Sequence, residues 1–590
     1  MFTFEGYIVL AVIAMIILSL YYEWKGTGFI FMVGISILGV FKILTPKEML
    51  AGFANEQIAV IILLLILGDI IRKNGIIDNF FYGTFMNTKS YKWFLGRMMV
   101  MVAGFSAFLN NTPLVAIMIP YVNAWGERNK ISPSKLLIPL SYATILGGCA
   151  TLIGTSTNLV VNGMVTDRGL EPLKIFDFSL VGIIMILVGF LYLLFFSGKL
   201  LPNRVAALND LEKQSREYIV EARISNQSKS IGKTIENAGL RNLNSLFLVE
   251  IIRDNKSIHA VSSQTVLKED DILLFAGDTT SITELINSRE GLVVTELSKF
   301  SELSKTEVIE IIVSHNSNLI SKTAKEINFR GVYDASIIAI HRNGERVSGK
   351  LGDVRLRAGD VLLVLAGEDF NQRNNSTQDF YVISKVRELK KIPLYKNILL
   401  IGGIIFTLVL SALGITKLFT ALLILLIIIV FTGTVSPKEI SRSIDYNLII
   451  VIALSLALGT AMINSGVAEV IAHNIINLLK PLGIIGLFSG IFLLTNVLAS
   501  FITNKASVAI IFPIALSLAI EMGIEPKPFI LLVAFAGAAS FMTPIGYQTN
   551  LMVYGPGGYK FKDFFKIGLP LTILYMLATV FVLVFQYNLL

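Results

Sequence analysis

The chain contains the same pattern of motifs twice, at a nearly constant separation. Three motifs of the N-terminal half recur in the C-terminal half, at separations of 391, 393 and 392 residues. They are Thr-Pro-Lys-Glu at 45–48 with Ser-Pro-Lys-Glu at 436–439, Asn-Asn-Thr at 110–112 with Thr-Asn-Lys at 503–505, and 153–159 with 545–551. The first match extends along an apolar stretch to 74–76 in one half and 465–467 in the other. A duplicated apolar chain with polar interruptions at matching points is typical of a secondary transporter.

Composition places this duplication in a membrane. Of the 590 residues, 54% are hydrophobic and only 16% are charged, and many apolar runs are long enough to cross about 30 Å of hydrocarbon. The single cysteine, Cys149, excludes an intramolecular disulfide framework. The sequence carries no Cys/His cluster and no kinase, protease or Ser/His/Asp signature, so we expect a transporter and not an enzyme.

Each half is predicted to hold six apolar segments, of which the fourth and fifth are interrupted by polar residues. The fourth has the Asn-Asn-Thr or Thr-Asn-Lys motif at its middle, and we interpret it as a re-entrant hairpin. The fifth is interpreted as a broken helix, which is tolerated at membrane depth only where it lines a cavity in the protein. The segments are 6–23, 26–44, 55–72, 93–121, 136–163 and 179–200, then 397–414, 417–434, 446–464, 483–521, 527–554 and 567–588.

These segments predict a polytopic α-helical membrane protein with two inverted repeats. Each repeat has five transmembrane helices, one of them broken, and one hairpin; the odd number of crossings inverts the second repeat. With the N-terminus outside, the short inside segments carry fourteen Lys and Arg and the outside segments seven, which favours this orientation. The connector at 202–395 is then cytoplasmic, and we expect the protein in the cell inner (plasma) membrane.

The connector is itself duplicated and predicts two small α+β modules. Each copy is predicted to have an alternating strand, a helix near Thr234 or Thr323 and a turned strand pair, and one further segment is repeated in both copies. The matched strands, turns and further segments are 218–222 and 308–312, 253–255 and 342–344, and 269–277 and 358–367. Neither copy has a G-x-G-x-x-G fingerprint or a P-loop. The predicted domains are an N-terminal membrane repeat at 1–201, a linker at 202–216, modules at 217–298 and 302–388, and a C-terminal membrane repeat at 393–590.

The hairpin tips and broken helices carry the polar groups that can bind an ion. Amide, hydroxyl and main-chain oxygens suit a hard cation such as Na⁺, whereas the N-termini of the helices that follow the tips suit an anion. One such cluster is typical of a helix kink held by hydrogen bonds. Four clusters paired across a duplication favour a site for one anion with two flanking cations.

Two charged residues within the apolar segments allow alternative interpretations. Lys505 replaces the neutral Thr112 of the other half. A lysine at membrane depth costs roughly 2.5–3.5 kcal/mol. It either binds the anion or occupies a cation site as a built-in ammonium, unless it extends to an aqueous edge. Asp69 is the candidate proton carrier, although pairing with Arg72 at ordinary helix spacing explains it as well; its counterpart is Thr460.

At the tips and broken helices the chain resembles the divalent anion/sodium symporter family of the ion-transporter superfamily. The segments 148–158 and 543–559 are similar to its sulfate-permease-like branch, and the modules are similar to the paired TrkA-C (RCK C-terminal) domains that this branch often carries. The resemblance covers essentially the whole chain. It implies Na⁺-coupled symport of sulfate or a similar divalent oxyanion by an elevator mechanism, in a homodimer with regulatory cytosolic modules. No cofactor is expected besides Na⁺ as the coupling ion.

Carried over by position, the resemblance implies a set of site residues. The substrate-binding residues are Asn111, Thr112, Thr157, Asn158, Asn504, Lys505, Thr549 and Asn550. The cation-binding residues are Asn110, Asn111, Thr155, Thr503, Asn504 and Thr543. Carboxylate-transporting members show Ser-Asn-Thr at both tips, so the tips of this chain favour a compact oxyanion.

Other functions stay open at this point. Within transport they are dicarboxylate symport and cation/proton antiport. From another class they are an RCK-regulated ion channel, although no Thr-Val-Gly-Tyr-Gly filter is present, and a non-transporting membrane sensor. The modules either bind a cytosolic nucleotide or metabolite or only dimerise the protein. The expected surroundings are the lipid bilayer and a small inorganic anion, with no nucleic acid.

Overall fold

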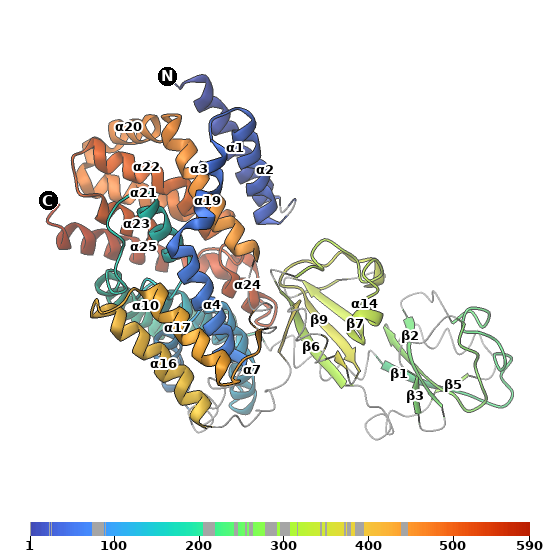
Figure 1. The fold of residues 1–590 in the computed structure, drawn as a ribbon. Coiled ribbons are helices and arrows are strands. Elements are labelled where there is room, and N and C mark those ends of the chain that lie inside the picture. The colour runs from blue at the N-terminus through green and yellow to red at the C-terminus, as the bar shows by residue number, and fades with distance from the viewer. Residues whose placement is uncertain are drawn as a thin grey trace.

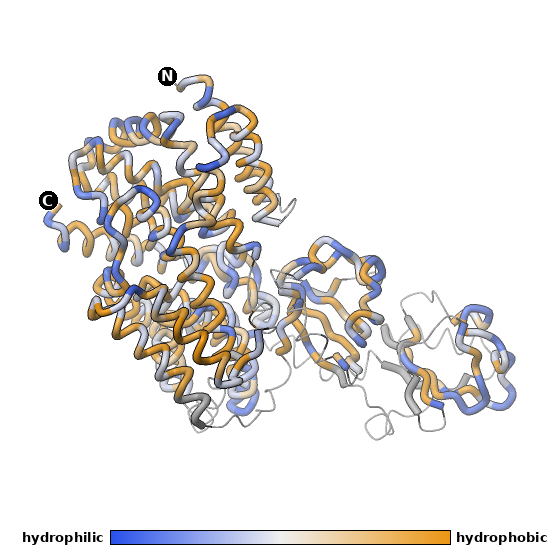
Figure 2. The backbone as a smooth tube through the Cα atoms, in the orientation of Figure 1, coloured by the Kyte–Doolittle hydropathy of each residue, from blue (hydrophilic) through white to orange (hydrophobic). Residues whose placement is uncertain are grey.

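The computed structural model shows a helical body beside two β-sheets (Figure 1). Apolar residues dominate the helices, whereas polar residues gather on the loops of the sheets (Figure 2). The described residues are 2–22, 24, 26–73, 88, 90–204, 219–240, 246–253, 256–258, 264–277, 292–294, 307–314, 317–342, 345–347, 351–367, 369–370, 373, 379–383, 394–437, 440 and 446–589. The predicted motif end at 74–76 and the predicted linker beyond Arg204 lie outside these residues.

Helices occupy all twelve predicted apolar segments, and the fourth and fifth segments of each half are divided into two helices. In the N-terminal half the helices are α1 (Phe4–Tyr21), α2 (Thr27–Val40), α3 (Pro46–Ala51), α4 (Glu56–Lys73), α6 (Tyr91–Ser106), α7 (Asn111–Arg128), α8 (Leu137–Gly148), α9 (Ser156–Asp167) and α10 (Ser179–Leu200). In the C-terminal half they are α16 (Leu394–Ala412), α17 (Leu418–Phe431), α19 (Tyr446–Asn464), α20 (Val467–Leu479), α21 (Gly483–Phe501), α22 (Asn504–Glu521), α23 (Pro526–Ala538), α24 (Gln548–Tyr554) and α25 (Phe561–Gln586).

Several of these helices are long and apolar enough to cross a membrane. Within the described ranges there are five such spans, or six if the pair bent by 42° at 55–57 counts as one span. The five are α1, α10, α22, α25 and the continuous run of α20 and α21 at Val467–Phe501. The chain is therefore a multi-pass membrane protein.

The repeated Thr-Pro-Lys-Glu motif is a helix start. The Thr45 hydroxyl accepts from the Glu48 amide at 3.3 Å, and the Glu48 carboxylate accepts from the Thr45 amide at 2.8 Å. This capping box, with Pro46 in the first turn, satisfies amides that α3 leaves without intrahelical partners. In the second copy of the motif, Lys438 and Glu439 lie outside the described residues.

Helix α20 was not among the predicted segments. It follows Gly466, whose φ of +71° lets the chain reverse after α19, and it has one apolar face. Its polar side carries His473, whose Nδ1 lies 2.7 Å from Glu521 Oε1. A search for apolar runs overlooks a helix of this kind because its polar residues interrupt the run.

The helices pack into two groups. The hairpins and broken helices, α6 to α9 and α21 to α24, pack with α10 and α25. The remaining helices, α1 to α4, α16, α17, α19 and α20, lie around this group, with α19 packed on α22 and α4 on α9. The hairpin arm α6 and the broken helix α8 approach closely because Gly147 faces the backbone of Ala103, where a side chain would not fit.

The connector at 202–395, from here on the insert, contains two five-stranded antiparallel sheets with the same topology, one in each module. Their orders are β3-β2-β4-β1-β5 and β8-β7-β9-β6-β10, and each has a bulge in its second strand, between Leu248 and Glu250 or between Ile337 and Ala339. The strands of the first are β1 (Ile219–Ile224), β2 (Leu246–Arg253), β3 (Lys256–Ile258), β4 (Ile272–Gly277) and β5 (Leu292–Val294). Those of the second are β6 (Glu307–Val313), β7 (Ala335–Arg342), β8 (Glu345–Arg346), β9 (Val361–Ala366) and β10 (Phe380–Val382).

One buried ion pair recurs in both sheets at a separation of 89 residues. Arg253 Nε and Arg342 Nε donate to Asp271 Oδ1 and Asp360 Oδ1 at 2.7 and 2.8 Å, and a second guanidinium nitrogen contacts the other oxygen at 2.7 Å in each sheet. The bond to Asp360 raises the pKa of Arg342. The pair fixes the turn before β4 and β9 in the same way.

The predicted helix near Thr234 or Thr323 was wrong. Both residues form isolated bridges, to Val266 and Arg355, and turns follow them. In the second module the amide of Lys325 donates to Gly352 at 3.1 Å, outside any helix. Because the backbone donors bond to a neighbouring segment, the chain coils there without completing a helix. The short helix α14 (Phe329–Tyr333) follows.

Candidate functional site

The N-terminal hairpin turns at 107–110 and presents its polar motif in the first turn of α7. Asn111 and Thr112 are buried, at 1% and 5% exposure, where helix amides have no intrahelical partner. Asn110 precedes the helix in an extended conformation and is exposed. Of the three predicted residues at this tip, two therefore face the protein interior.

The C-terminal hairpin places its motif in the same way at the start of α22. The Thr503 hydroxyl caps the helix by accepting from the Ala506 amide at 3.2 Å. Asn504 is 9% exposed, and its Oδ1 accepts from Ser540 Oγ at 3.1 Å. Lys505 is half-buried in the first turn.

The two broken helices are held open by matching hydrogen bonds. The Thr151 and Thr543 hydroxyls accept from the amides of the glycines three residues on, at 3.1 and 3.0 Å. The carbonyls of the same threonines accept from the amides of Asn158 and Asn550 side chains, at 3.0 and 3.1 Å. The predicted Thr543 thus supports the loop of its broken helix, and its unpredicted counterpart Thr151 does the same.

Each half completes the site of the other. Thr112 donates to Gln548 Oε1 at 2.8 Å, and Asn111 Nδ2 donates to the Tyr547 hydroxyl at 2.7 Å. The Tyr547 hydroxyl also lies 3.1 Å from Thr155 Oγ1. The N-terminal tip is therefore bonded to the C-terminal broken helix.

A second set of bonds joins the broken helices to each other and to the C-terminal tip. Ser141 Oγ of α8 lies 2.8 Å from Thr549 Oγ1 and 2.7 Å from Asn550 Oδ1. Asn550 Nδ2 donates to the carbonyl of Ser540, and the hydroxyl of Ser540 donates to Asn504 Oδ1. Thr157 packs beside Gly537 on α23, near this cluster.

The predicted residues thus divide into two classes. Those that the structure gathers into one buried polar region are Asn111, Thr112, Thr155, Thr157, Asn158, Asn504, Thr543, Thr549 and Asn550. The exposed Asn110, the capping Thr503 and the half-buried Lys505 lie at the rims of the two tips.

Sequence reasoning missed six polar residues of this region, of which Thr151 is described above. Tyr547 and Gln548 stand within the interrupted segment, so their polarity was a usable signal. Ser106, Ser141 and Ser540 are single small residues in or beside apolar helices, and nothing in the sequence separates them from packing residues. The Ser106 hydroxyl lies within hydrogen-bond distance of Asn111 Oδ1 and of the Thr144 carbonyl.

The hydrogen-bond polarity of the region distinguishes donors from acceptors. The amide oxygens of Gln548 and Asn504 are already accepting, from Thr112 and Ser540, and neither NH₂ group has a protein partner in the described part of the chain. Conversely, Asn158 Oδ1 is fully buried with no partner among the described residues. The region therefore offers free donors for an anion and at least one free oxygen for a cation.

The described part of this region has one sulfur, on the buried Cys149, and no cluster of acidic or sulfur ligands for a metal. No group of three His, Cys, Asp or Glu side chains gathers there or elsewhere in the described ranges. A cation at the tips would be held by neutral oxygens, which suits Na⁺ better than a transition metal.

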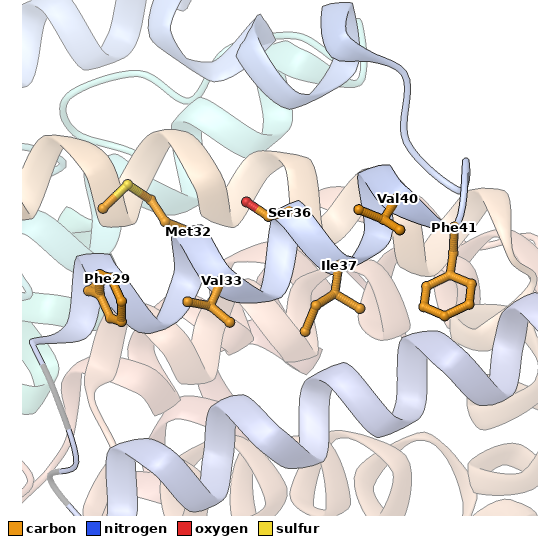
Figure 3. A pocket seen from close by; sticks show the side chains of 7 residues that line it. All are labelled: Phe29, Met32, Val33, Ser36, Ile37, Val40 and Phe41. Atoms are coloured by element: carbon orange, nitrogen blue, oxygen red, sulfur yellow. The ribbon is translucent and has the colours of Figure 1, made fainter.

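Away from this polar region, a groove of about 400 Å³ runs along α2 (Figure 3). Its lining residues come from one helix and are apolar apart from Ser36: Phe29, Met32, Val33, Ile37, Val40 and Phe41. A surface of this kind suits lipid or another apolar helix and offers almost no donors to an anion.

Comparison with known proteins gives consistent relatives. The family model described as citrate transporter matches residues 5–417 and 398–590. The chain is 34% identical to an uncharacterized transporter of Synechocystis sp., over 97% of this chain and 95% of the relative. It is 33% identical to a candidate sulfur deprivation response regulator of Chlamydomonas reinhardtii, over 91% and 94%. It is 24% identical to sodium/sulfate cotransporter 2 of the same alga, over 99% and 90%.

Proposed function

The chain belongs to the citrate transporter family, and on that premise we propose that it is a symporter that uses Na⁺ to take up sulfate or a similar divalent oxyanion. Relatives that match nearly the whole chain are named sodium/sulfate cotransporters. The proposal places the chain in the sulfate-permease-like branch of the wider superfamily, with TrkA-C-like modules in the insert.

The observation that carries the proposal is the pair of free amide donors. Gln548 and Asn504 come from different elements, and both present NH₂ groups whose partner oxygens are already engaged. A compact oxyanion such as sulfate accepts several short hydrogen bonds from such donors. The first turns of α7, α9 and α22 add the positive ends of their helix dipoles.

Na⁺ is assigned to the oxygen-rich side of the same region. The unpaired Asn158 Oδ1 and the unwound carbonyls of the broken helices are hard, neutral ligands. Lys505, at the start of α22, takes part in balancing the charge of a divalent anion.

The transport step we propose is an elevator movement. The hairpins and broken helices, with α10 and α25, would move as the carrier of the ions, against a scaffold of the outer helices. The two halves would be inverted repeats, the N-terminus would face outward, and the insert would be cytosolic. A homodimer formed through the outer helices would hold the scaffold still in the membrane. A cytosolic nucleotide or metabolite bound to the insert would adjust the rate of transport.

Uptake into proteoliposomes tests the proposal. We expect radiolabelled sulfate to accumulate faster with an inward Na⁺ gradient than with choline in its place, and excess succinate or citrate to leave that uptake unchanged. Absence of sulfate uptake from a protein that is folded and inserted would refute the proposal.

The family description favours one alternative, the symport of a carboxylate. The same assay distinguishes it, because labelled succinate or citrate would then accumulate and sulfate would not compete. Dicarboxylate transport would also require the free amides to bind two carboxylates that lie several ångströms apart, where a single compact anion needs one centre.

A further inference from the structure

The second module of the insert packs directly on the end of α24. A Cβ added to Gly359 would lie 2.9 Å from Leu551 Cγ. On the other side of the contact, Gly555 faces Val361 and lies where a Cβ would be 3.3 Å from the Gly359 carbonyl. Ile312, Val361 and Ile383 belong to the same buried apolar cluster as the membrane helices. The sheet and the helical body thus share one interface (Figure 1).

Gly359 serves this interface and not the turn in which it lies. Its φ is +81°, which favours glycine. The corresponding turn of the first module has Asp270 at a φ of +63°, so the same turn forms without glycine. The first module does not need the close approach, and there the position carries a side chain that pairs with Arg223 at 3.0 Å.

The start of the insert holds the same segment at its other end. Arg204 is the last described residue before the first module, and its guanidinium donates to the Gly558 carbonyl. The same group lies 2.8 Å from Asp563, at the start of α25. The Arg204 amide donates to Ser134 Oγ at 3.1 Å. Residues 551–563 are thus contacted by both the entry to the insert and its second module.

Helix α24 needs such support. It has seven residues, and a helix of that length is not stable by itself. Its first turn carries Gln548, Thr549 and Asn550, whereas the docked Leu551 is the next residue. Hydrogen bonds from Thr112 and Ser141 hold this first turn. The contacts of Leu551 and Gly555 with the second module hold the rest of the helix, so both sets of contacts fix where the free NH₂ group of Gln548 lies.

We propose that docking of the second module on 551–563 positions α24 and thereby raises the affinity of the anion site; this rests on the proposed function. The module is then an allosteric element whose docked and undocked states bind the anion differently. By linkage, the anion favours the docked state by the same factor as docking favours the anion. A cytosolic molecule that bound one of the two states would change uptake without touching the site.

Two variants open the interface from opposite sides. Gly359→Asp copies the first module and places a side chain against Leu551, and Gly555→Ala places a methyl group against Val361. Gly555 has helical φ and ψ of −65° and −56°, so alanine is tolerated there. The control is Gly352→Asp, the same substitution in the same module at a position with open space around it. Adding Val361→Ala to Gly555→Ala removes the methyl clash and should restore the contact.

The measurements are hydrogen exchange and sulfate binding on the purified full-length protein. We expect faster exchange at 548–558 in both interface variants, and a dissociation constant for labelled sulfate raised at least about fivefold. The control and the double variant should stay within twofold of the wild type. Faster exchange with an unchanged dissociation constant would overturn the proposal.

The outcome for the proposed function is separable. If the wild-type protein binds no sulfate, the proposed function fails. Hydrogen exchange at 548–550 then still tests whether docking of the second module positions α24. Unchanged exchange at those residues in both interface variants would overturn that part of the proposal.

Discussion

Exchanging the Gln548 amide for a carboxylate tests the donor arrangement most directly. In Gln548→Glu the side chain keeps its shape and still accepts the hydrogen bond that Thr112 gives at 2.8 Å. Only the free NH₂ group is replaced, by an oxygen that carries negative charge. The substitution therefore separates loss of an anion donor from loss of packing or of the bond between the halves.

The magnitude follows from the bond that is lost. A hydrogen bond to a charged group contributes about 1.5–3 kcal/mol. Since about 1.4 kcal/mol corresponds to a factor of ten, sulfate affinity should fall by about 10- to 150-fold. Repulsion between the new carboxylate and the divalent anion acts in the same direction, so the fall should lie toward the upper end of that range.

Binding of labelled sulfate to the purified protein gives the dissociation constant, and uptake into proteoliposomes gives the transport rate. The control is Gln586→Glu, the same change at an exposed position at the end of α25. It should leave affinity unchanged. Sulfate affinity within twofold of the wild type in Gln548→Glu would refute the assignment of Gln548 as an anion donor.

Three further predictions follow from the same region and from the insert. Tyr547→Phe leaves the buried amide nitrogen of Asn111 without its acceptor and should lower the free energy of unfolding by about 1–3 kcal/mol, seen as a lower midpoint in thermal unfolding. Gly148→Ser places a Cβ 2.9 Å from the amide of Asn111 and should reduce uptake more than tenfold, whereas Gly104→Ser, with open space around it, should not. Asp360→Asn weakens a buried ion pair and should destabilise the second module by about 1–3 kcal/mol, measured as faster hydrogen exchange at 307–366 with no change in the first module.

The positions at which the apolar segments break were predictable from residue chemistry. Polar groups at 110–112 and 503–505 cannot lie within an apolar helix at membrane depth without partners. The helices break just before these motifs, and new helices start at Asn111 and Asn504. The duplicated strands of the insert were predictable because Asp271 and Asp360 lie in the same sequence context. In the structure each of them pairs with an equivalent arginine, Arg253 or Arg342.

The partners within the candidate site were not predictable. Asn111 of the N-terminal tip bonds to Tyr547 in the broken helix of the other half, and no repeated motif of the sequence singles out that pair. Single serines such as Ser141 give no signal among apolar neighbours. The contact between Gly359 and Leu551 joins two segments with unrelated patterns, and only their three-dimensional proximity reveals it.

The exchange of bonds between the halves has a consequence for how the protein is made. The partners of Asn111 and Thr112 lie 436 residues further along the chain. At about 5–20 residues per second, they are synthesised roughly 20–90 s after the tip that needs them. During that interval the N-terminal hairpin has its polar groups in the membrane with no acceptors from the second half. The polar region is accordingly one of the last parts of the protein to assemble. A translation stall before residue 548 would leave the N-terminal half inserted in the membrane without the partners that complete its polar region.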